Sequence, residues 1–307
     1  MLNRDDQKCA PSKTLINGTC YTINQLKDIA NYYNKEHEKD LIIFDENTSK
    51  KRLLYRIMIK ITTKTKCDNQ ICWLRQDFMQ KNVDVDMLNN TFRPKGPANQ
   101  GNFKWISNFD IKYVMSQYEY KYNDYKFLGA VPIDFEEVNY LNLNNINLEN
   151  LYNTRYKLGL IINLDKHNQS GSHWVSLFIN LKTYEIYFSD SGGIRPNKYI
   201  RNFIKKIANF CYIKYNNLKN NDDISSINSD VSFMNKNNLN KYEKLFPIKY
   251  NQIQIQNSDS ECGIFSINFI LRLLKGETFD DYIKNHPTDS EVNKCRNIYF
   301  IDENKNH

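Results

Sequence analysis

Residues 256–265 of the chain are Gln-Asn-Ser-Asp-Ser-Glu-Cys-Gly-Ile-Phe, and an apolar run then continues to Lys275. Its apolar positions cover every side of a helix, so the pattern predicts a buried helix that begins at Cys262. A cysteine there lies near the positive end of the helix macrodipole and near unpaired backbone N–H groups. Both favour the nucleophilic thiolate, and the N–H groups can hold an oxyanion. A buried structural cysteine would satisfy the same pattern.

Two segments upstream predict a β-hairpin. Residues 173–181 and 184–190 both alternate and are rich in β-branched and aromatic side chains, with two residues between them. Antiparallel pairing would bring His173, at the start of the first strand, close to Asp190, at the end of the second. An aspartate in that place can orient a histidine, which can then take the proton of a cysteine. Alternatively, His173 is an ordinary histidine at a strand edge and Asp190 a turn residue.

These residues together resemble the catalytic signature of a known family. His173-Trp174, then Asp190-Ser191, then Gln256 six positions before Cys262-Gly263 are similar to the ubiquitin-like-protein-processing cysteine proteases, which include the SUMO proteases and the adenovirus protease. The resemblance covers residues 100–280. Within that superfamily, residues 105–111 and 127–135 look most like the polyprotein-processing proteases of large DNA viruses such as African swine fever virus.

The resemblance implies an α+β fold: a papain-like or SUMO-protease-like core, with a central mixed sheet flanked by helices, and a mainly helical N-terminal region. It also implies a role for four residues. Cys262 would be the nucleophile, and His173 the general base and later the general acid. Asp190 would orient His173, although some viral members carry Asn in its place. Gln256 would donate its side-chain amide to the oxyanion, beside the backbone N–H of Cys262.

Three more residues are candidates for the substrate cleft. Trp105 resembles the family's tryptophan near the cleft, but a core aromatic is an equally good interpretation. Asn108 follows in the same stretch, and we expect it to line the cleft. Trp174 is expected mainly to pack beside His173 and to shield the catalytic residues.

The expected function is that of a cysteine endopeptidase. The resemblance implies cleavage of viral core or capsid polyproteins after Gly-Gly-Xaa-type sites during virion maturation, in the host cytoplasm (viral factory) and the virion. One alternative is an isopeptidase that acts on ubiquitin or SUMO conjugates. Another is a catalytically silent scaffold that binds glycine-rich tails. No cofactor is expected.

The chain of 307 residues is expected to form two parts, a helical N-terminal region or arm at 1–95 and a catalytic domain at 96–307. The hydrophobic periodicity predicts N-terminal helices at 23–33 and 50–63. In the catalytic domain we expect a helix at 197–212, and a polar surface loop at 216–240. The remaining expected strands lie at 127–135, 158–165, 211–215 and 247–255.

The seven cysteines lack the even spacing of a disulfide framework, and no signal peptide is evident, so a reducing cytoplasm is the simplest expectation. A zinc site built from Cys9, Cys20, Cys67 and Cys72 is an alternative for four of them. No apolar run reaches the length of a membrane-spanning helix, and no membrane insertion is expected.

The net charge of +7 is spread along the chain and is densest at Lys50-Lys51-Arg52 and Lys205-Lys206. Such clusters are usually solvated surfaces, although they would permit weak nucleic-acid binding. His167, in a polar loop between two predicted strands, is the rival to His173 as the base. No upstream carboxylate is expected to orient it.

Overall fold

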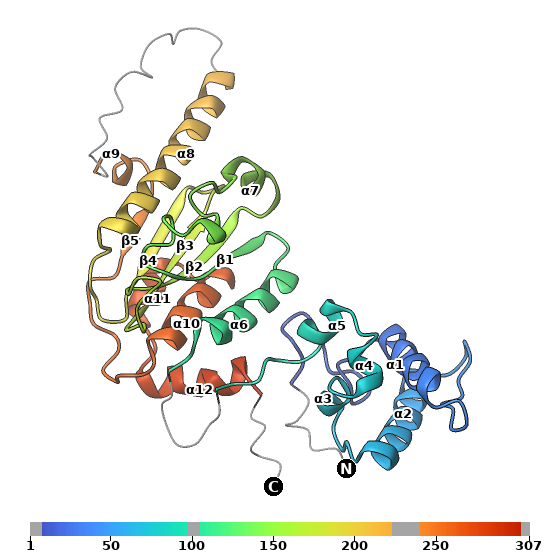
Figure 1. Ribbon diagram of the computed structural model, residues 1–307. Coiled ribbons are helices and arrows are strands. Elements are labelled where there is room, and N and C mark those ends of the chain that lie inside the picture. Colours follow the sequence, from blue (N-terminus) through green and yellow to red (C-terminus); the bar gives the residue numbers. More distant parts are fainter. Residues whose placement is uncertain (1–7, 98–104, 223–239, 302–307) are drawn as a thin grey trace. The chain divides into compact units, whose positions relative to one another are not determined.

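The computed structural model describes residues 8–97, 105–222 and 240–301. It divides the chain into two compact units (Figure 1). The first takes Met1–Gln100, Ser116–Lys121 and Arg296–His307, and the second takes Gly101–Met115 and Tyr122–Cys295.

The first unit is mainly helical. It contains α1 (Ile23–Glu36), α2 (Lys50–Thr65), α3 (Gln70–Trp73), α4 (Asp77–Gln80) and α5 (Val85–Asn90). The helices predicted at 23–33 and 50–63 are thus present as α1 and α2, and each ends two or three residues later than expected. Thr22 and Gln25 form a capping box at the start of α1, and Ser49 caps α2. The apolar face of each helix contributes to one core, which includes Leu26, Ile57 and Trp73.

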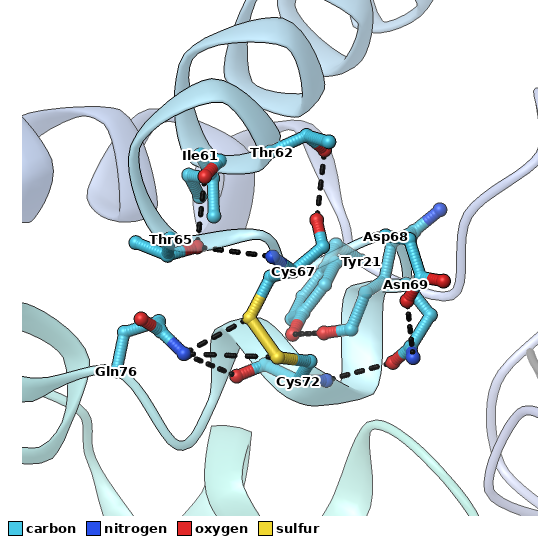
Figure 2. The surroundings of a disulfide bond; sticks show 10 residues. Tyr21, Ile61, Thr62, Thr65, Cys67, Asp68, Asn69, Cys72 and Gln76 are labelled. Carbon is cyan, nitrogen blue, oxygen red and sulfur yellow. Dashed lines mark hydrogen bonds between the residues drawn. A yellow bond between two sulfur atoms is a disulfide. The ribbon is translucent and has the colours of Figure 1, made fainter.

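Two disulfide bonds stabilise this unit. Cys9 is bonded to Cys20, and Cys67 to Cys72. Figure 2 shows the second bond, with the Gln76 amide directed at it from the side; Gln76 Nε2 donates to Cys67 Sγ at 2.9 Å. The expectation that the cysteines form no disulfide framework was therefore wrong. So was the zinc alternative, because all four of its ligands are bonded in pairs. The pairs join positions close in sequence, which the overall spacing of seven cysteines does not reveal.

The second unit is built on a five-stranded mixed sheet in the order β1-β2-β3-β4-β5. Its strands are β1 (Tyr125–Pro132), β2 (Lys157–Asn163), β3 (Trp174–Asn180), β4 (Glu185–Ser189) and β5 (Ile248–Tyr250). The pairs β2–β3 and β3–β4 are antiparallel, and the outer pairs β1–β2 and β4–β5 are parallel. The predicted hairpin is present as β3 and β4.

Helices cover both faces of this sheet, as Figure 1 shows. On one face α8 (Lys198–Asp222) packs Phe203 and Ile207 against the alternate residues Val175 and Leu177 of β3. On the other, α10 (Cys262–Leu274) lies against β3 and β2. Eight of the thirteen residues of α10 are aliphatic or aromatic, and every residue of the helix except Arg272 is buried. The prediction of an α+β core, with a central mixed sheet flanked by helices and a mainly helical N-terminal region, is confirmed.

The remaining elements are α6 (Asn108–Lys121), the 3-10 helix at Asn139–Leu141, α7 (Leu148–Thr154), α9 (Asn240–Glu243), α11 (Phe279–Lys284) and α12 (Asp289–Tyr299). Among the described residues, no helix combines the length and the apolar character that crossing a membrane requires.

Three expected elements differ from the structure. Residues 211–215 are not a strand but continue α8, because Cys211 keeps the helical spacing of the buried residues before it. The strand expected at 247–255 is only β5, three residues long. Residues 216–222, expected in a loop, form the end of α8; the rest of that loop, 223–239, lies outside the described residues.

Candidate active site

Cys262 is the first residue of α10, and only 3% of its surface is exposed. The backbone N–H groups of the first turn have no partners inside the helix, and they carry the positive end of its macrodipole. Gly263 follows because no larger residue fits. A Cβ atom there would lie 2.6 Å from Ile106 Cγ1 and 3.3 Å from Trp174 Cδ1. The start of the helix is therefore packed directly against the segment before α6 and the first residue of β3.

His173 and Asp190 meet at one end of the hairpin. His173 precedes β3 and Asp190 follows β4. Continued beyond the pair Ser176 and Ser189, the register places Asp190 opposite Val175 and diagonally across from His173, on the same face. His173 Nε2 lies 2.7 Å from Asp190 Oδ1, and the two side chains are 27% and 2% exposed. Because Nε2 faces the carboxylate, Nδ1 is the ring nitrogen left for the hydrogen bond between His173 and Cys262.

One backbone N–H and the side chain of Asn251 fix Asp190. Its Oδ1 accepts the N–H of Gly192 at 2.8 Å. Asn251, just after β5, accepts the N–H of Asp190 at 2.9 Å and donates to its carbonyl at 2.6 Å. The carboxylate therefore has one fixed orientation toward His173. Nothing in the sequence singled out Asn251, because it is one of many asparagines in the chain.

The environment of His173 favours its protonated form. Burial alone would lower the pKa of the imidazole, but the hydrogen bonds and charges of Asp190 and Cys262 outweigh it and raise the pKa to about 9. An imidazolium beside a cysteine at a helix N-terminus is the arrangement of an ion-paired nucleophile.

Gln256 contacts Ser191, the residue that follows Asp190. Its backbone N–H donates to Ser191 O at 3.0 Å, and its Oε1 accepts the Ser191 hydroxyl at 2.6 Å. Its Nε2 donates to the carbonyl of Ser258. An amide nitrogen carries two hydrogens, so this bond leaves one N–H for another acceptor. Ser191 thus orients Gln256, a role that its place after Asp190 did not reveal.

The three residues expected at a substrate cleft line one pocket of about 430 Å³, together with residues of the loops after β1 and β2. Trp105 is 48% exposed and Asn108, at the start of α6, is exposed. Trp174 is buried, and its Nε1 donates to Ile106 O at 3.2 Å. Trp174 and Ile106 therefore separate this pocket from the start of α10.

His167 does have an orienting carboxylate, contrary to expectation. Its Nδ1 lies 2.6 Å from Asp134 Oδ2, and its backbone N–H donates to Asp134 Oδ1 at 3.0 Å. Asp134 follows β1, and the sequence could not show that β1 would pair in parallel with β2 and align the two loops. His167 lines the pocket.

Comparison with known proteins agrees with this geometry. A sequence model of the Ulp1 protease family, C-terminal catalytic domain, matches residues 158–306. The chain is 34% identical over 300 residues to a thiol protease of Acanthamoeba polyphaga mimivirus, covering 92% of this chain and 89% of the relative. It is 23% identical over 257 residues to a SUMO-1 cysteine protease of African swine fever virus, covering 76% and 83%.

A crystal structure of a protease from African swine fever virus shares the fold. It superposes with a TM-score of 0.55 at 20% identity, covering 85% of this chain and 94% of that one. The family match includes β3, β4, β5 and α10, and with them His173, Asp190 and Cys262. The chain therefore belongs to the Ulp1 protease family and is a cysteine protease.

Proposed function

We propose that the protein is a maturation endopeptidase that cleaves viral core or capsid polyproteins after Gly-Gly-Xaa-type sites. The observation that carries the proposed catalysis is the hydrogen-bonded series Asp190–His173–Cys262 at the start of α10. Gln256 is held by the hydroxyl of Ser191, the residue after Asp190. The substrate class rests on similarity to the viral proteases.

Each catalytic residue has one task in the proposed reaction. His173 takes the thiol proton of Cys262, and the thiolate attacks the carbonyl carbon of the scissile peptide bond. The negative charge that forms on the carbonyl oxygen is stabilised by the backbone N–H of Cys262 and the remaining N–H of Gln256 Nε2. His173 then gives its proton to the leaving amine, and a thioester remains on Cys262.

Water completes the cycle. His173, now neutral, takes a proton from a water molecule, which attacks the thioester. The same two N–H groups hold the second oxyanion. When it collapses, the carboxylate product leaves and the proton returns to Cys262. Asp190 keeps its charge throughout and holds His173 in the orientation that both steps need.

A second candidate is an isopeptidase that releases ubiquitin-like modifiers, because the matched family is that of Ulp1 and one relative is named a SUMO-1 cysteine protease. The catalytic steps are the same for both, so the substrate decides between them. The test compares a polyprotein fragment containing Gly-Gly-Xaa with a SUMO or ubiquitin C-terminal fusion, using Cys262→Ala as control.

Cleavage of the polyprotein fragment alone, abolished by Cys262→Ala, is the expected result. Cleavage of the fusion alone would replace the endopeptidase by the isopeptidase. Cleavage of neither, with full binding of the fragment to wild type and Cys262→Ala alike, would support a silent scaffold.

The proposal also locates the protein in the host cytoplasm and the virion. The two disulfides remove the cysteine argument for a reducing compartment, so this part rests on the relatives alone. We also propose weak nucleic-acid binding at the basic clusters Lys50-Lys51-Arg52 and Lys205-Lys206. Lys206, in one of the two basic clusters, is engaged by Glu136 at 3.2 Å and by two backbone carbonyls.

A further inference from the structure

The second unit contains a second aspartate-oriented imidazole that the proposed reaction does not use. Asp134 is 2% exposed and accepts two hydrogen bonds from His167, one from the ring and one from the backbone. The His167 side chain is 52% exposed. Burying a carboxylate is costly unless it is hydrogen-bonded. Here one bond holds the backbone of His167 and the other holds its half-exposed ring. His167 is therefore held in one orientation.

The loop that carries His167 is braced on both sides. Asn163, at the end of β2, accepts the N–H groups of Asp165 and Ser172 at 3.0 and 3.2 Å. Gln169 Oε1 accepts the N–H of Lys166 at 2.8 Å. These bonds fix the loop at its start, middle and end, so the ring of His167 presents Nε2 from a defined place.

The lining of the pocket around His167 indicates which ligand Nε2 could bind. Because Nδ1 faces Asp134, Nε2 is directed away from it, and His167 lines the pocket with Lys166 beside it in sequence. The pocket lining also includes the large apolar side chains of Trp105, Pro132 and Tyr140. A substrate side chain with an apolar stem and a charged end would contact both kinds of lining residue.

We propose that His167, oriented by Asp134, is a specificity-determining residue that binds a carboxylate side chain of the substrate near the Gly-Gly site. The inference deepens the proposed function, since it names a feature of the same substrate. An imidazolium donates a charge-assisted hydrogen bond from Nε2 to a carboxylate, and Lys166 adds a second positive charge. A neutral imidazole offers Nε2 only as an acceptor, so binding takes up a proton.

Charged residues lie on the loop of His167 and on the turn after β1. Asp134 is ionised, because the hydrogen bonds from His167 outweigh the effect of burial and hold the pKa of its carboxyl below the usual value. Asp165 and Lys166, on the same loop, line the pocket with opposite charges, and Asp165 Oδ1 accepts the Ser172 hydroxyl at 2.8 Å. On the turn after β1, Glu136 is paired with Lys206. The ionised Asp134 is therefore a fixed acceptor for Nδ1–H of His167.

Binding to the Cys262→Ala protein tests the inference without requiring turnover. The probes are fluorescent Gly-Gly peptides in matched pairs, with Glu or Gln at each of several positions on both sides of the two glycines. At one position, the Glu peptide should bind about tenfold more tightly than the Gln peptide at low pH. The preference should weaken as the pH rises, because only a protonated imidazole donates from Nε2 when Nδ1 faces Asp134. Cys262, which this background lacks, contributes to the raised pKa of His173, so the effect is assigned by the His167→Gln variant and not by the pH profile alone.

Two further variants test whether the preference for Glu depends on His167 and Asp134. His167→Gln and Asp134→Asn, each in the Cys262→Ala background, should lose the Glu preference and its pH dependence. Asn168→Ala, which changes an exposed neighbour on the same loop, should keep both. Equal binding of every Glu and Gln pair, or a preference that survives in His167→Gln, would overturn the inference. Its failure is separate from that of the proposed function, which would show as absent cleavage by the wild-type protein.

Discussion

At the scale of single residues, the proposed chemistry depends on the charge of His173. Asp190 and Cys262 both stabilise the imidazolium, and Asn251 and Gly192 fix Asp190 in place. The sequence predicted the meeting of His173 and Asp190, because a hairpin of known register brings its two ends together. It could not predict the residues that hold them, since Asn251 and Ser191 act through contacts between distant parts of the chain.

The pH dependence of activity should report His173. We expect kcat/KM to fall as the pH rises through about 9, where the imidazolium loses its proton. In Asp190→Asn the favourable charge is lost, so this fall should move to lower pH by about one to two units, with a lower maximum. Measured pH–rate profiles check this. An alkaline limb in the same place in both proteins would mean that Asp190 does not act on His173.

The free energy of unfolding should also depend on the protonation of His173. The folded pKa of His173, about 9, lies above its ordinary value of 6.5, so its contribution is complete below pH 6.5 and disappears as the pH rises through 9. Between those values the wild type should lose up to about 3 kcal/mol more unfolding free energy than His173→Gln. Urea unfolding at both ends of the range measures it. Equal losses in the two proteins would contradict the assignment.

At the scale of the elements, α10 and the hairpin were predictable because each has a strong local pattern. One is apolar on all sides and the other alternates. The C-terminal half of α8 was not, since residues 211–215 are aromatic and β-branched and only their packing against the sheet makes them helical. The pair of Asp134 and His167 was missed for a related reason. It exists only because β1 and β2 pair in parallel, which neither strand's own sequence specifies.

The first turn of α10 is tightly packed at Gly263. A methyl group at Gly263 would overlap Ile106 and press on Trp174, so Gly263→Ala should displace the first turn and cost about 1–3 kcal/mol of stability. Because that turn carries Cys262, kcat/KM should fall by roughly 100-fold. Ser266→Ala, which removes an atom from the same helix, should change activity far less. Full activity of Gly263→Ala would show that the helix start is more adaptable than its contacts indicate.

At the scale of the whole molecule, the chain divides into two units with separate cores, and within the described residues both disulfides belong to the first unit. The sequence separations are 11 and 5 residues, for which loop-closure entropy gives about 2–3 kcal/mol each. A reductant should therefore lower the unfolding temperature of the first unit. A variant with Ser at positions 9, 20, 67 and 72 should unfold at the lower temperature with or without reductant. No effect of the reductant on the wild type would mean that the bonds do not form in solution.

The central claim is that Cys262 is the nucleophile for a substrate ending in Gly-Gly. The most direct measurement is covalent trapping with a Gly-Gly peptide that carries a thiol-reactive electrophile at its C-terminus, followed by mass spectrometry of the digested protein. The account predicts a single adduct on Cys262, absent in Cys262→Ala and much slower to form in His173→Ala. Modification of Cys211 or Cys295 in place of Cys262, or equal rates with and without His173, would contradict it.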